Sequence, residues 1–424
     1  MKTSNLLQTL LFSLVLLSFV SCEDKCTEVT DFVRYVPVFI DQAEYERPVS
    51  MESAQEIVNP GVIASYGDYL YINEFNEGIH VINNSDPTAP VNEAFIAINN
   101  NKHFSISDGR VLANRYGDLV SVDIRNRNNV REVSRTANVF PDEAEITPEG
   151  LISHYERTSE RVSRDCEDAF FGSFWREGND IFVSDASFDG AVMTNSQRTN
   201  SLNNNSNTSV SSSTARFTIT KNTLYVLNST SLEVFNISDP SAPVLTNTTG
   251  VGGGVETLFP LNDYLFIGAN AGMSIYDVSN AETPMFLSQF EHAVACDPVV
   301  ADERTAYVTL RSGNRCAGIV NELQVINIEN IRSPQRTARL QLDNPRGLAV
   351  MGEHLMICDG DDGVVTVNVS NQMNPVITGR FSQEHANDIL QVADNIVVVS
   401  GENGIYELDI TDINNPKLIS NITR

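Results

Sequence analysis

"VFNISDPSAPVL", residues 234–245, joins two apolar runs through a turn that contains two prolines. Asp239 can hydrogen-bond to the backbone two residues further on, and Pro240 and Pro243 fix φ and lack an N–H, so the turn cannot continue a sheet ladder. The β-branched and aromatic residues on both sides of the turn are typical of strands. The stretch therefore predicts two strands that are joined by a tight connection.

The same turn recurs along the chain at a spacing close to 41 residues. Related stretches are VINNSDPTAPV ending at residue 91, SVDIRNRNNV at 130, IYDVSNAETPM at 285, VINIENIRSPQ at 335, TVNVSNQMNPV at 376 and ELDITDINNPK at 417. The proline position falls at residues 90, 130 (a valine), 243, 284, 334, 375 and 416, which gives spacings of 40, 113, 41, 50, 41 and 41. A period of this length indicates a repeat architecture.

Each repeat contains four short apolar runs that are separated by turns. In residues 347–381 these runs are 347–350, 355–358, 364–369 and 376–381. Four antiparallel strands in each unit of ~40 residues predict the blades of a β-propeller, an all-β fold. The spacing of 113 fits two units, of which the first is degenerate and carries a long insertion. First strands near residues 62, 104, 145, 216, 256, 298, 347 and 388 then predict eight blades, or seven if the unit near 145 is not a true blade.

The repeat unit resembles the LVIVD repeat of bacterial envelope lipoproteins, which are found mostly in Bacteroidetes. The resemblance covers roughly residues 55–424 and includes ARFTI at 215–219, CDPVVADERTAYVTLRSGNRC at 296–316 and NPRGLAV at 344–350. It implies a propeller fold and an envelope location. It implies no catalytic residue, because the family is not known for a defined reaction.

The N-terminal residues predict an exported and lipid-anchored protein. Lys2 precedes an apolar stretch of about 15 residues, which suits a signal peptide and is short for a membrane span of about 20 residues. Ser21 before Cys22 resembles a lipobox, in which a peptidase cuts before the cysteine and the cysteine is acylated; an ordinary signal with an incidental cysteine is the alternative. We expect a signal peptide at 1–21, a lipid-anchored tether at 22–54 and a propeller at 55–424 with an insertion at about 156–215.

The charge balance argues against several classes of partner. The chain has 28 basic and 55 acidic residues, a formal net charge of −27. Removal of residues 1–21, whose only charged residue is Lys2, gives −28. Nucleic acid and anionic membrane surfaces are therefore not expected to bind, and we expect membrane contact only through the lipid anchor. The predicted location is the cell envelope, at the outer membrane, either periplasmic or surface-exposed.

The sequence contains no motif that predicts a metal or a cofactor. The six histidines show no HExxH pattern, and there is no G-x-S-x-G or phosphate-binding glycine loop. The stretch CDGDDGVV at 358–365 could offer oxygen ligands to calcium. Other repeats, however, place NEFNEGI, GANAGMS and SGENGIY at the same position. We therefore predict an ordinary hairpin turn there, and neither a metal nor a cofactor.

The spacing of two cysteines predicts a disulfide. Cys296 precedes the first strand of its unit and Cys316 follows the second, so both should lie at the same end of an antiparallel pair. An oxidising envelope compartment permits the bond, while two unrelated buried thiols are the alternative. Cys26, Cys166 and Cys358 have no predicted partner.

Charged residues are predicted to gather at one mouth of the propeller channel. The first strand of each blade lines the channel, so the residues just before these strands should surround one opening. Alignment of the repeats places there His103, Arg216, Glu256, Asp297, Arg346 and Asp388. Such a concavity with charges of both signs is a candidate binding site. In the alternative interpretation, Arg216 and Arg346 pair with neighbouring carboxylates and hold adjacent blades together.

Two functions from different classes fit the sequence. The first is a non-enzymatic binding or scaffold module for a protein or glycan partner, with no catalytic residues. The second is a hydrolase or lyase that acts on an envelope or extracellular glycan or ester through carboxylates and a histidine at the mouth. The second rests on analogy with other propellers alone, and the absence of a nucleophile–base motif favours the first.

If Cys22 is the acylated mature N-terminus, Cys22→Ala should abolish membrane association, because several acyl chains together provide a stable anchor. Intact mass and detergent partitioning measure this. Unchanged partitioning of the variant would exclude the anchor.

If Cys296 and Cys316 form a disulfide, a non-reducing peptide map should contain the crosslinked pair. The bond would stabilise the fold by roughly 3 kcal/mol on the chain-entropy model, less any strain in the native state. Complete alkylation of both thiols without reductant would contradict the prediction.

Overall fold

The structure is a computed structural model that describes residues 27–140, 145–147, 149–165, 174–177, 180–184, 210–211, 216–269, 272–291, 298–312, 320–402 and 404–423. The chain divides into two compact units, residues 1–39 with 154–189 and residues 40–153 with 190–424. The predicted signal peptide, Cys22, Cys26, Cys166, Asp297 and the Cys296–Cys316 pair lie outside the described residues. Among the residues that are described, no helix is long and apolar enough to cross a membrane.

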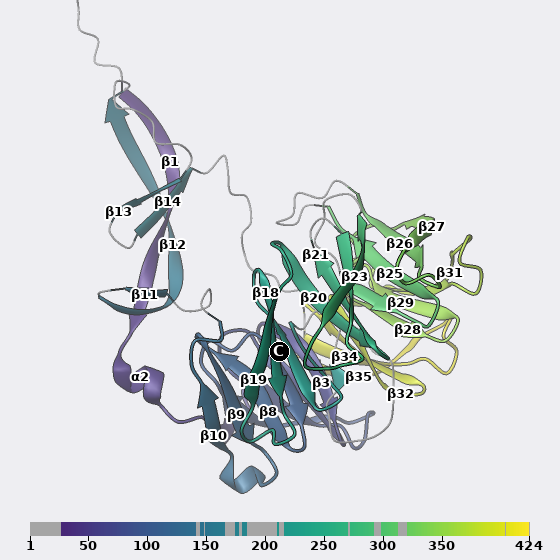
Figure 1. Cartoon of the computed structure of the whole chain (residues 1–424), viewed down its shortest axis with the longest axis horizontal. Coiled ribbons are helices and arrows are strands. Elements are labelled where there is room, and N and C mark those ends of the chain that lie inside the picture. The colour runs from purple at the N-terminus through teal and green to yellow at the C-terminus, as the bar shows by residue number, and fades with distance from the viewer. Residues whose placement is uncertain are drawn as a thin grey trace, which may run out of the picture. The chain divides into compact units, whose positions relative to one another are not determined.

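The second unit contains seven blades, each made of four consecutive antiparallel strands within the described residues (Figure 1). Blades 1 to 3 are β3 (Pro60–Tyr66), β4 (Tyr69–Glu74), β5 (Gly78–Asn83) and β6 (Val91–Ala97); β7 (Phe104–Ser107), β8 (Arg110–Arg115), β9 (Asp118–Asp123) and β10 (Arg131–Thr136); and β16 (Phe217–Thr220), β17 (Thr223–Leu227), β18 (Ser231–Asn236) and β19 (Val244–Gly250). Blades 4 and 5 are β20 (Val255–Leu261), β21 (Tyr264–Ala269), β22 (Gly272–Asp277) and β23 (Met285–Glu291); and β24 (Val299–Ala301), β25 (Thr305–Leu310), β26 (Glu322–Asn327) and β27 (Gln335–Gln341). Blades 6 and 7 are β28 (Leu348–Met351), β29 (His354–Cys358), β30 (Val364–Asn368) and β31 (Val376–Phe381); and β32 (Asp388–Ala393), β33 (Ile396–Gly401), β34 (Gly404–Asp409) and β35 (Lys417–Thr423).

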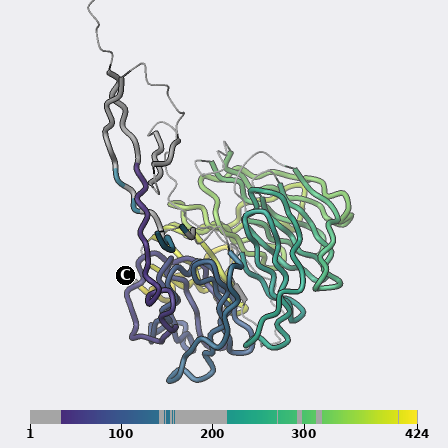
Figure 2. The backbone as a smooth tube through the Cα atoms, turned by 60° about the vertical axis from the view of Figure 1, so that its left-hand side comes forward, coloured from purple at the N-terminus to yellow at the C-terminus, as the bar shows by residue number. Residues whose placement is uncertain are grey.

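The blades form a closed ring. The first strand of each blade packs against the first strand of the next, and β32 of blade 7 packs against β3 of blade 1. The cartoon and the backbone tube both show the yellow last blade beside the purple first blade (Figures 1 and 2). The predicted all-β propeller is therefore confirmed. The ring contains seven blades among the described residues, which is the lower of the two blade counts, eight or seven, that the sequence allowed.

The unit near residue 145 is not a blade. Its two strands, β11 (Glu145–Thr147) and β12 (Gly150–Asp165), belong to a five-stranded sheet of order β11-β12-β1-β14-β13. The other members are β1 (Thr27–Ile40), β14 (Asp180–Ser184) and β13 (Phe174–Glu177). The long strand β12 pairs with β1 from the N-terminal region. Because β12 forms its hydrogen bonds with β11 and β1, it does not take part in a blade.

Four short elements add to the first two blades or lie between their strands. β2 (Ser50–Ser53) pairs with the outer strand β6, and β15 (Val210–Ser211) pairs with the inner strand β3. The helix α2 (Gln42–Glu46) rests on blade 2, where the Tyr45 hydroxyl donates to Asp118 and Arg135 donates to the Tyr45 carbonyl at 3.3 Å. The 3-10 turn η2 (Arg127–Asn129) lies in the connection between β9 and β10.

The turn that revealed the repeat has the predicted chemistry. The Asp239 side chain accepts from the Ser241 amide at 2.9 Å, and the Asp239 carbonyl accepts from the Ala242 amide at 3.0 Å. The turns of other blades repeat this geometry, with Asp86 and Asp412 accepting from amides two residues on. The same Asx and proline chemistry therefore ends the third strand and starts the outer strand in successive blades.

Ring closure depends on side-chain packing between blades 7 and 1. Each blade is complete within its own stretch of sequence, and among the described strands none is exchanged between the first and last blades. A buried apolar cluster fills the interface instead. Its members are Ile57, Ile63, Leu70, Ile72 and Ile82 from the N-terminal side and Leu390, Val398 and Ile405 from the C-terminal side. Burial of these side chains is the main favourable term that closes the ring.

A polar pair also lies in this interface. Glu407 in β34 is fully buried, and its Oε2 accepts from the Asn84 side chain of blade 1 at 3.4 Å. The other blades place at the Glu407 position Val81, Ser121, Val234, Ile275, Val325 and Thr366, and at the Asn84 position Ile124, Ile237, Val278, Ile328, Val369 and Ile410. The polar pair is thus specific to the seam between the last and first blades.

The hydroxyl-bearing residues at the Glu407 position show what the position does. Ser121 donates to the Pro240 carbonyl at 2.6 Å, and Thr366 donates to the Ile413 carbonyl at 2.8 Å. Each bond joins a blade to the turn of the next blade. Burial raises the pKa of Glu407 from 4.5 to about 7, so near neutral pH a large fraction of this side chain carries a proton.

This seam predicts a specific pH dependence of stability. A carboxyl group whose pKa rises on folding costs the native state stability as the pH climbs from the unfolded pKa to the folded one. Because the pKa of Glu407 rises from 4.5 to about 7, the wild type should lose on the order of 3 kcal/mol of unfolding free energy relative to Glu407→Gln across that interval. This loss of unfolding free energy should be absent below pH 4.5 and should stay constant above about pH 7.

Denaturant unfolding at about pH 4, 5, 6, 7 and 8 measures this difference. Glu353→Gln, at an exposed position, serves as the matched control and should follow the wild type at every pH. Parallel curves for wild type and Glu407→Gln would show that folding does not raise the pKa of Glu407.

Candidate functional site

The structure places five of the six predicted mouth residues at the start of the innermost strands. His103 immediately precedes β7, Arg216 immediately precedes β16, and Glu256 is the second residue of β20. Arg346 lies two residues before β28, and Asp388 begins β32. All five residues thus lie within two residues of the start of an innermost strand. The sixth, Asp297, lies outside the described part of the chain.

Both arginines connect adjacent blades. The Arg216 guanidinium donates to the Val255 carbonyl of blade 4 at 3.4 Å, and the Arg346 guanidinium donates to the Asn387 side chain just before blade 7. These hydrogen bonds go to a carbonyl and an amide oxygen, and the charges of Glu402 and Asp361 also act on Arg346. The arrangement supports the interpretation in which these arginines hold neighbouring blades together.

Two of the predicted residues are buried between blades. The His103 ring stacks on Phe217 of blade 3 with 6.1 Å between ring centroids. Asp388 is fully buried, and its Oδ1 accepts from the Ile389 amide at 2.6 Å. A Cβ at Gly347 would lie 2.9 Å from that Oδ1, so blade 6 approaches the carboxylate closely. His103 and Asp388 therefore belong to the blade interfaces more than to the open mouth.

A network of buried asparagines joins blades 1 and 2, and sequence reasoning missed it. The Asn73 side chain donates to Asn101 Oδ1 at 2.8 Å, and Asn101 donates to the Asn114 carbonyl at 3.1 Å. Asn114 Oδ1 in turn accepts from the main-chain amides of Lys102 and His103, each at 2.8 Å. Asn73 and Asn114 each lie next to the last residue of a second strand. That shared position was a signal in the sequence.

A buried acidic residue lies at the end of the second strand in both blade 1 and blade 6, and it accepts hydrogen bonds from main-chain amides. Glu74 accepts from the amides of Val58 and Asn59 at 3.0 and 2.5 Å. Asp359 accepts from the amide of Asn344 at 2.7 Å and from that of the preceding residue at 3.2 Å. In both blades the bonded segment contains Asn-Pro, at the start of β3 in blade 1 and shortly before β28 in blade 6. The acid therefore fixes the path of the chain into the channel wall.

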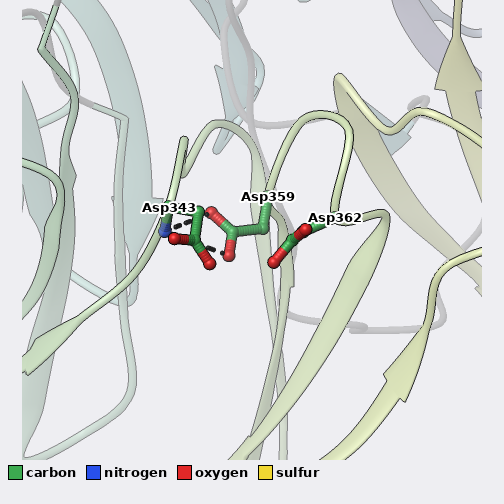
Figure 3. Close-up of side chains that lie close together, drawn as sticks. All are labelled: Asp343, Asp359 and Asp362. Atoms are coloured by element: carbon green, nitrogen blue, oxygen red, sulfur yellow. Dashed lines mark hydrogen bonds between the residues drawn. The ribbon is translucent and has the colours of Figure 1, made fainter.

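Three aspartates of blade 6 lie close together (Figure 3). The carboxylates of Asp343, Asp359 and Asp362 approach within 4.8 Å of one another. The hydrogen bond to Asp362 and its charge raise the pKa of Asp343. The Arg380 guanidinium pairs with Asp362 and lies 4.0 Å from Asp359, so a cation of the chain already balances part of this charge. Residues 358–365, which contain Asp359 and Asp362, form the hairpin between β29 and β30, as predicted.

A group of titratable side chains with two highly exposed carboxylates lies where blades 6 and 7 meet. The side chain of His385 is 8% exposed, and its Nε2 lies 3.8 Å from an oxygen of Asp361 and 3.8 Å from an oxygen of Glu402. These two carboxylate side chains are 95% and 69% exposed. Burial, and then the charge of Arg346, lower the pKa of His385. The imidazole is therefore neutral at pH 7, with two solvent-facing carboxylates beside it.

This group, which we call the mouth cluster, consists of Arg346, Asp361, His385 and Glu402. Sequence reasoning found Arg346 and missed the other three. Asp361 and Glu402 lie in the β29–β30 and β33–β34 hairpins, and His385 lies three residues before β32. The repeat alignment placed the hairpins of Asp361 and Glu402 at equivalent positions but could not show that they lie beside His385, because hairpin tips come together only when the blades pack. The cluster can bind a polar or charged group through hydrogen bonds and charge.

Comparison with solved structures finds other proteins of low sequence identity. BamB from Moraxella catarrhalis has a TM-score of 0.45 at 11% identity, over 88% of this chain and 96% of that chain. Hsv2 from Kluyveromyces lactis has a TM-score of 0.47 at 8% identity, over 85% and 98% of the two chains. PorZ, a surface component of the type-IX secretion system of Porphyromonas gingivalis, has a TM-score of 0.48 at 12% identity, over 88% of this chain and 39% of PorZ.

No curated protein matches the sequence. The family profile described as "LVIVD repeat" matches residues 61–101, 217–249, 254–291 and 344–383. These four segments coincide with blades 1, 3, 4 and 6. The chain is thus a seven-bladed β-propeller that carries LVIVD repeats.

Proposed function

We propose that this protein is a lipid-anchored envelope module whose propeller binds a protein or glycan partner at the mouth cluster, without breaking bonds. The observation that carries the proposal is the pair of solvent-facing carboxylates, Asp361 and Glu402, beside the buried imidazole of His385. The lipobox-like Ser21-Cys22 and the resemblance to envelope lipoproteins support the location. The net charge of −27 agrees with a partner that is not nucleic acid.

The backbone around the mouth cluster is held in place before any partner arrives. The Ala386 amide donates to the Gly360 carbonyl at 3.0 Å, and the Gly347 amide donates to the Asn387 carbonyl at 3.1 Å. These bonds connect blade 6 to the segment that carries His385. A site that is already ordered loses less conformational entropy on binding, so rigid hairpins favour recognition of a partner.

The chemistry of the cluster indicates which partner groups it would recognise. Exposed carboxylates accept hydrogen bonds from glycan hydroxyls or from lysine and arginine side chains. The neutral imidazole has one donor nitrogen and one acceptor nitrogen. Burial lowers the pKa of Arg346. Its guanidinium nonetheless stays charged at neutral pH and can donate a hydrogen bond to an acceptor of the ligand. The cluster therefore suits a polar ligand with both donors and acceptors.

One observation favours a hydrolase or lyase as a second candidate function. A neutral histidine within 3.8 Å of two carboxylates is a suitable general base, provided that a substrate proton comes within hydrogen-bond reach. His385→Asn would remove such an activity while keeping a hydrogen-bonding side chain. Turnover of an envelope glycan or ester by the wild type, lost in this variant, would replace the binding proposal.

The binding proposal predicts that Asp361→Asn with Glu402→Gln weakens partner binding at least tenfold. Both side chains are highly exposed, so the melting temperature should not change. The immobilised wild type captures partners from detergent-solubilised envelope, and calorimetry then measures the affinity of the identified partner for each variant. The exposed Glu353→Gln, outside the cluster, is the control and should bind like the wild type. Equal affinity of the double variant would show that the binding face lies elsewhere.

A further inference from the structure

The outer strand of each blade exposes one hydrogen-bonding edge, and most of these edges are protected. Unpaired edge N–H and C=O groups are a template for another strand, and natural proteins block them with charges, prolines or a covering segment. In blade 1, β2 covers β6 through pairs that run from Ser50 with Ala97 to Ser53 with Ala94. Five other outer strands contain charged residues, namely Arg131, Glu132 and Arg135 in β10, Glu291 in β23, Arg336 and Arg339 in β27, Arg380 in β31 and Lys417 in β35.

Among the residues that the structure describes, the outer strand of blade 3 has no such protection. β19 has the sequence VLTNTTG, without a charge or a proline and with three β-branched threonines. Val244 and Leu245 at its start are 59% and 48% exposed. A Cβ added at Gly250, its last residue, would meet no atom within 4 Å among the described residues. β19 is therefore a seven-residue edge that is open to solvent and favours strand pairing.

The chain itself shows that an outer edge of this propeller accepts an added strand. β6 and β19 are the fourth strands of their blades, and β6 pairs antiparallel with β2 while keeping its full pairing with β5. The added strand places Met51 against the apolar cluster of blades 1 and 2. Main-chain bonds therefore supply affinity at such an edge, and alternate side chains supply specificity.

We propose that β19 is a docking site for an extended segment of a partner protein, which adds an antiparallel strand to blade 3. The charges around β19 define the chemistry of that segment. Glu233 is the only charged residue in β16–β19; it accepts from the Thr248 hydroxyl, and Asp239 lies in the adjoining turn. The carbonyl of Glu282, from blade 4, accepts from the Asn247 side chain at 3.1 Å.

Glu233 and the formal net charge of −27 favour a partner strand with basic ends, and Val244 and Leu245 favour apolar residues opposite them. Asp239 contributes less to this preference, because Arg125 interacts with it and Arg110 donates to the neighbouring Ser241 at 2.8 Å. A second copy of the chain would instead bring two acidic surfaces together, at a formal charge of −27 each. The site uses no residue of the mouth cluster, so it is independent of the function proposed for the mouth. Variants of one surface should leave the other unaffected.

The test uses a fluorescein-labelled peptide, Lys-Val-Thr-Val-Thr-Val-Lys, and the same peptide with proline in place of its central valine. Fluorescence anisotropy should show saturable binding of the first peptide to the full chain, and at least tenfold weaker binding of the proline peptide, which cannot complete the strand ladder. Hydrogen exchange of the β19 amides should slow in the presence of the first peptide. Added salt should weaken binding, because the charges are exposed.

The matched variants are Leu245→Lys in β19 and Ile377→Lys in β31. Both residues are exposed apolar residues at the second position of an outer strand, so the substitutions are equivalent in the repeat. Leu245→Lys should weaken the peptide at least tenfold, while Ile377→Lys should not, and both should keep the wild-type melting temperature.

Absence of saturable binding, equal binding of the proline peptide, or equal binding to Leu245→Lys would each overturn the proposal. Light scattering provides a further arm. A wild-type dimer that Leu245→Lys converts to monomer would identify a second copy of the chain, and not a basic partner segment, as the occupant of β19.

Discussion

The closure of the ring between blades 7 and 1 is the contact on which the rest of the structure depends. Every other pair of neighbouring blades is joined by the chain, whereas this pair is held by side-chain packing across the Ile63–Leu390 cluster. If the seam opens, the innermost strands no longer surround a common channel, and the mouth loses its geometry. The buried Glu407–Asn84 pair makes this one seam sensitive to protonation, because burying an ionised carboxylate is costly.

The repeats divide the work between apolar and polar positions. Apolar side chains of the strands fill the interfaces between neighbouring blades. Where a blade carries a hydroxyl residue at such a position, as with Ser121 and Thr366, the side chain donates a hydrogen bond to a main-chain carbonyl of the next blade. Arg216 and Arg346 perform the same task at the channel end through oxygen acceptors of the following blade. The channel end is thus built in part from the contacts that hold the ring together.

The open groups of the molecule are those that these contacts do not use. At the mouth they are the hairpin carboxylates of Asp361 and Glu402, which project beyond the interblade bonds. At the periphery it is the edge of β19, whose equivalents are charged or covered. A propeller with seven similar blades therefore presents two different surfaces because individual repeats depart from the common pattern at exposed positions.

The sequence alone determined the repeat, the four-stranded blade, the turn chemistry at Asp239 and the start of each innermost strand, because all of these depend on local spacing of apolar, Asx and proline residues. It also led to Arg216 and Arg346 at the blade junctions. Only the tertiary structure decided that the unit near residue 145 leaves the ring, since the pairing of β12 with β1 joins segments more than 100 residues apart. It alone showed that Asp388 is buried while Asp361 is open, and that His385 lies between two carboxylates. The burial of a side chain and the contacts between hairpin tips depend on how the blades pack. The local sequence pattern does not specify which residues of neighbouring blades will meet.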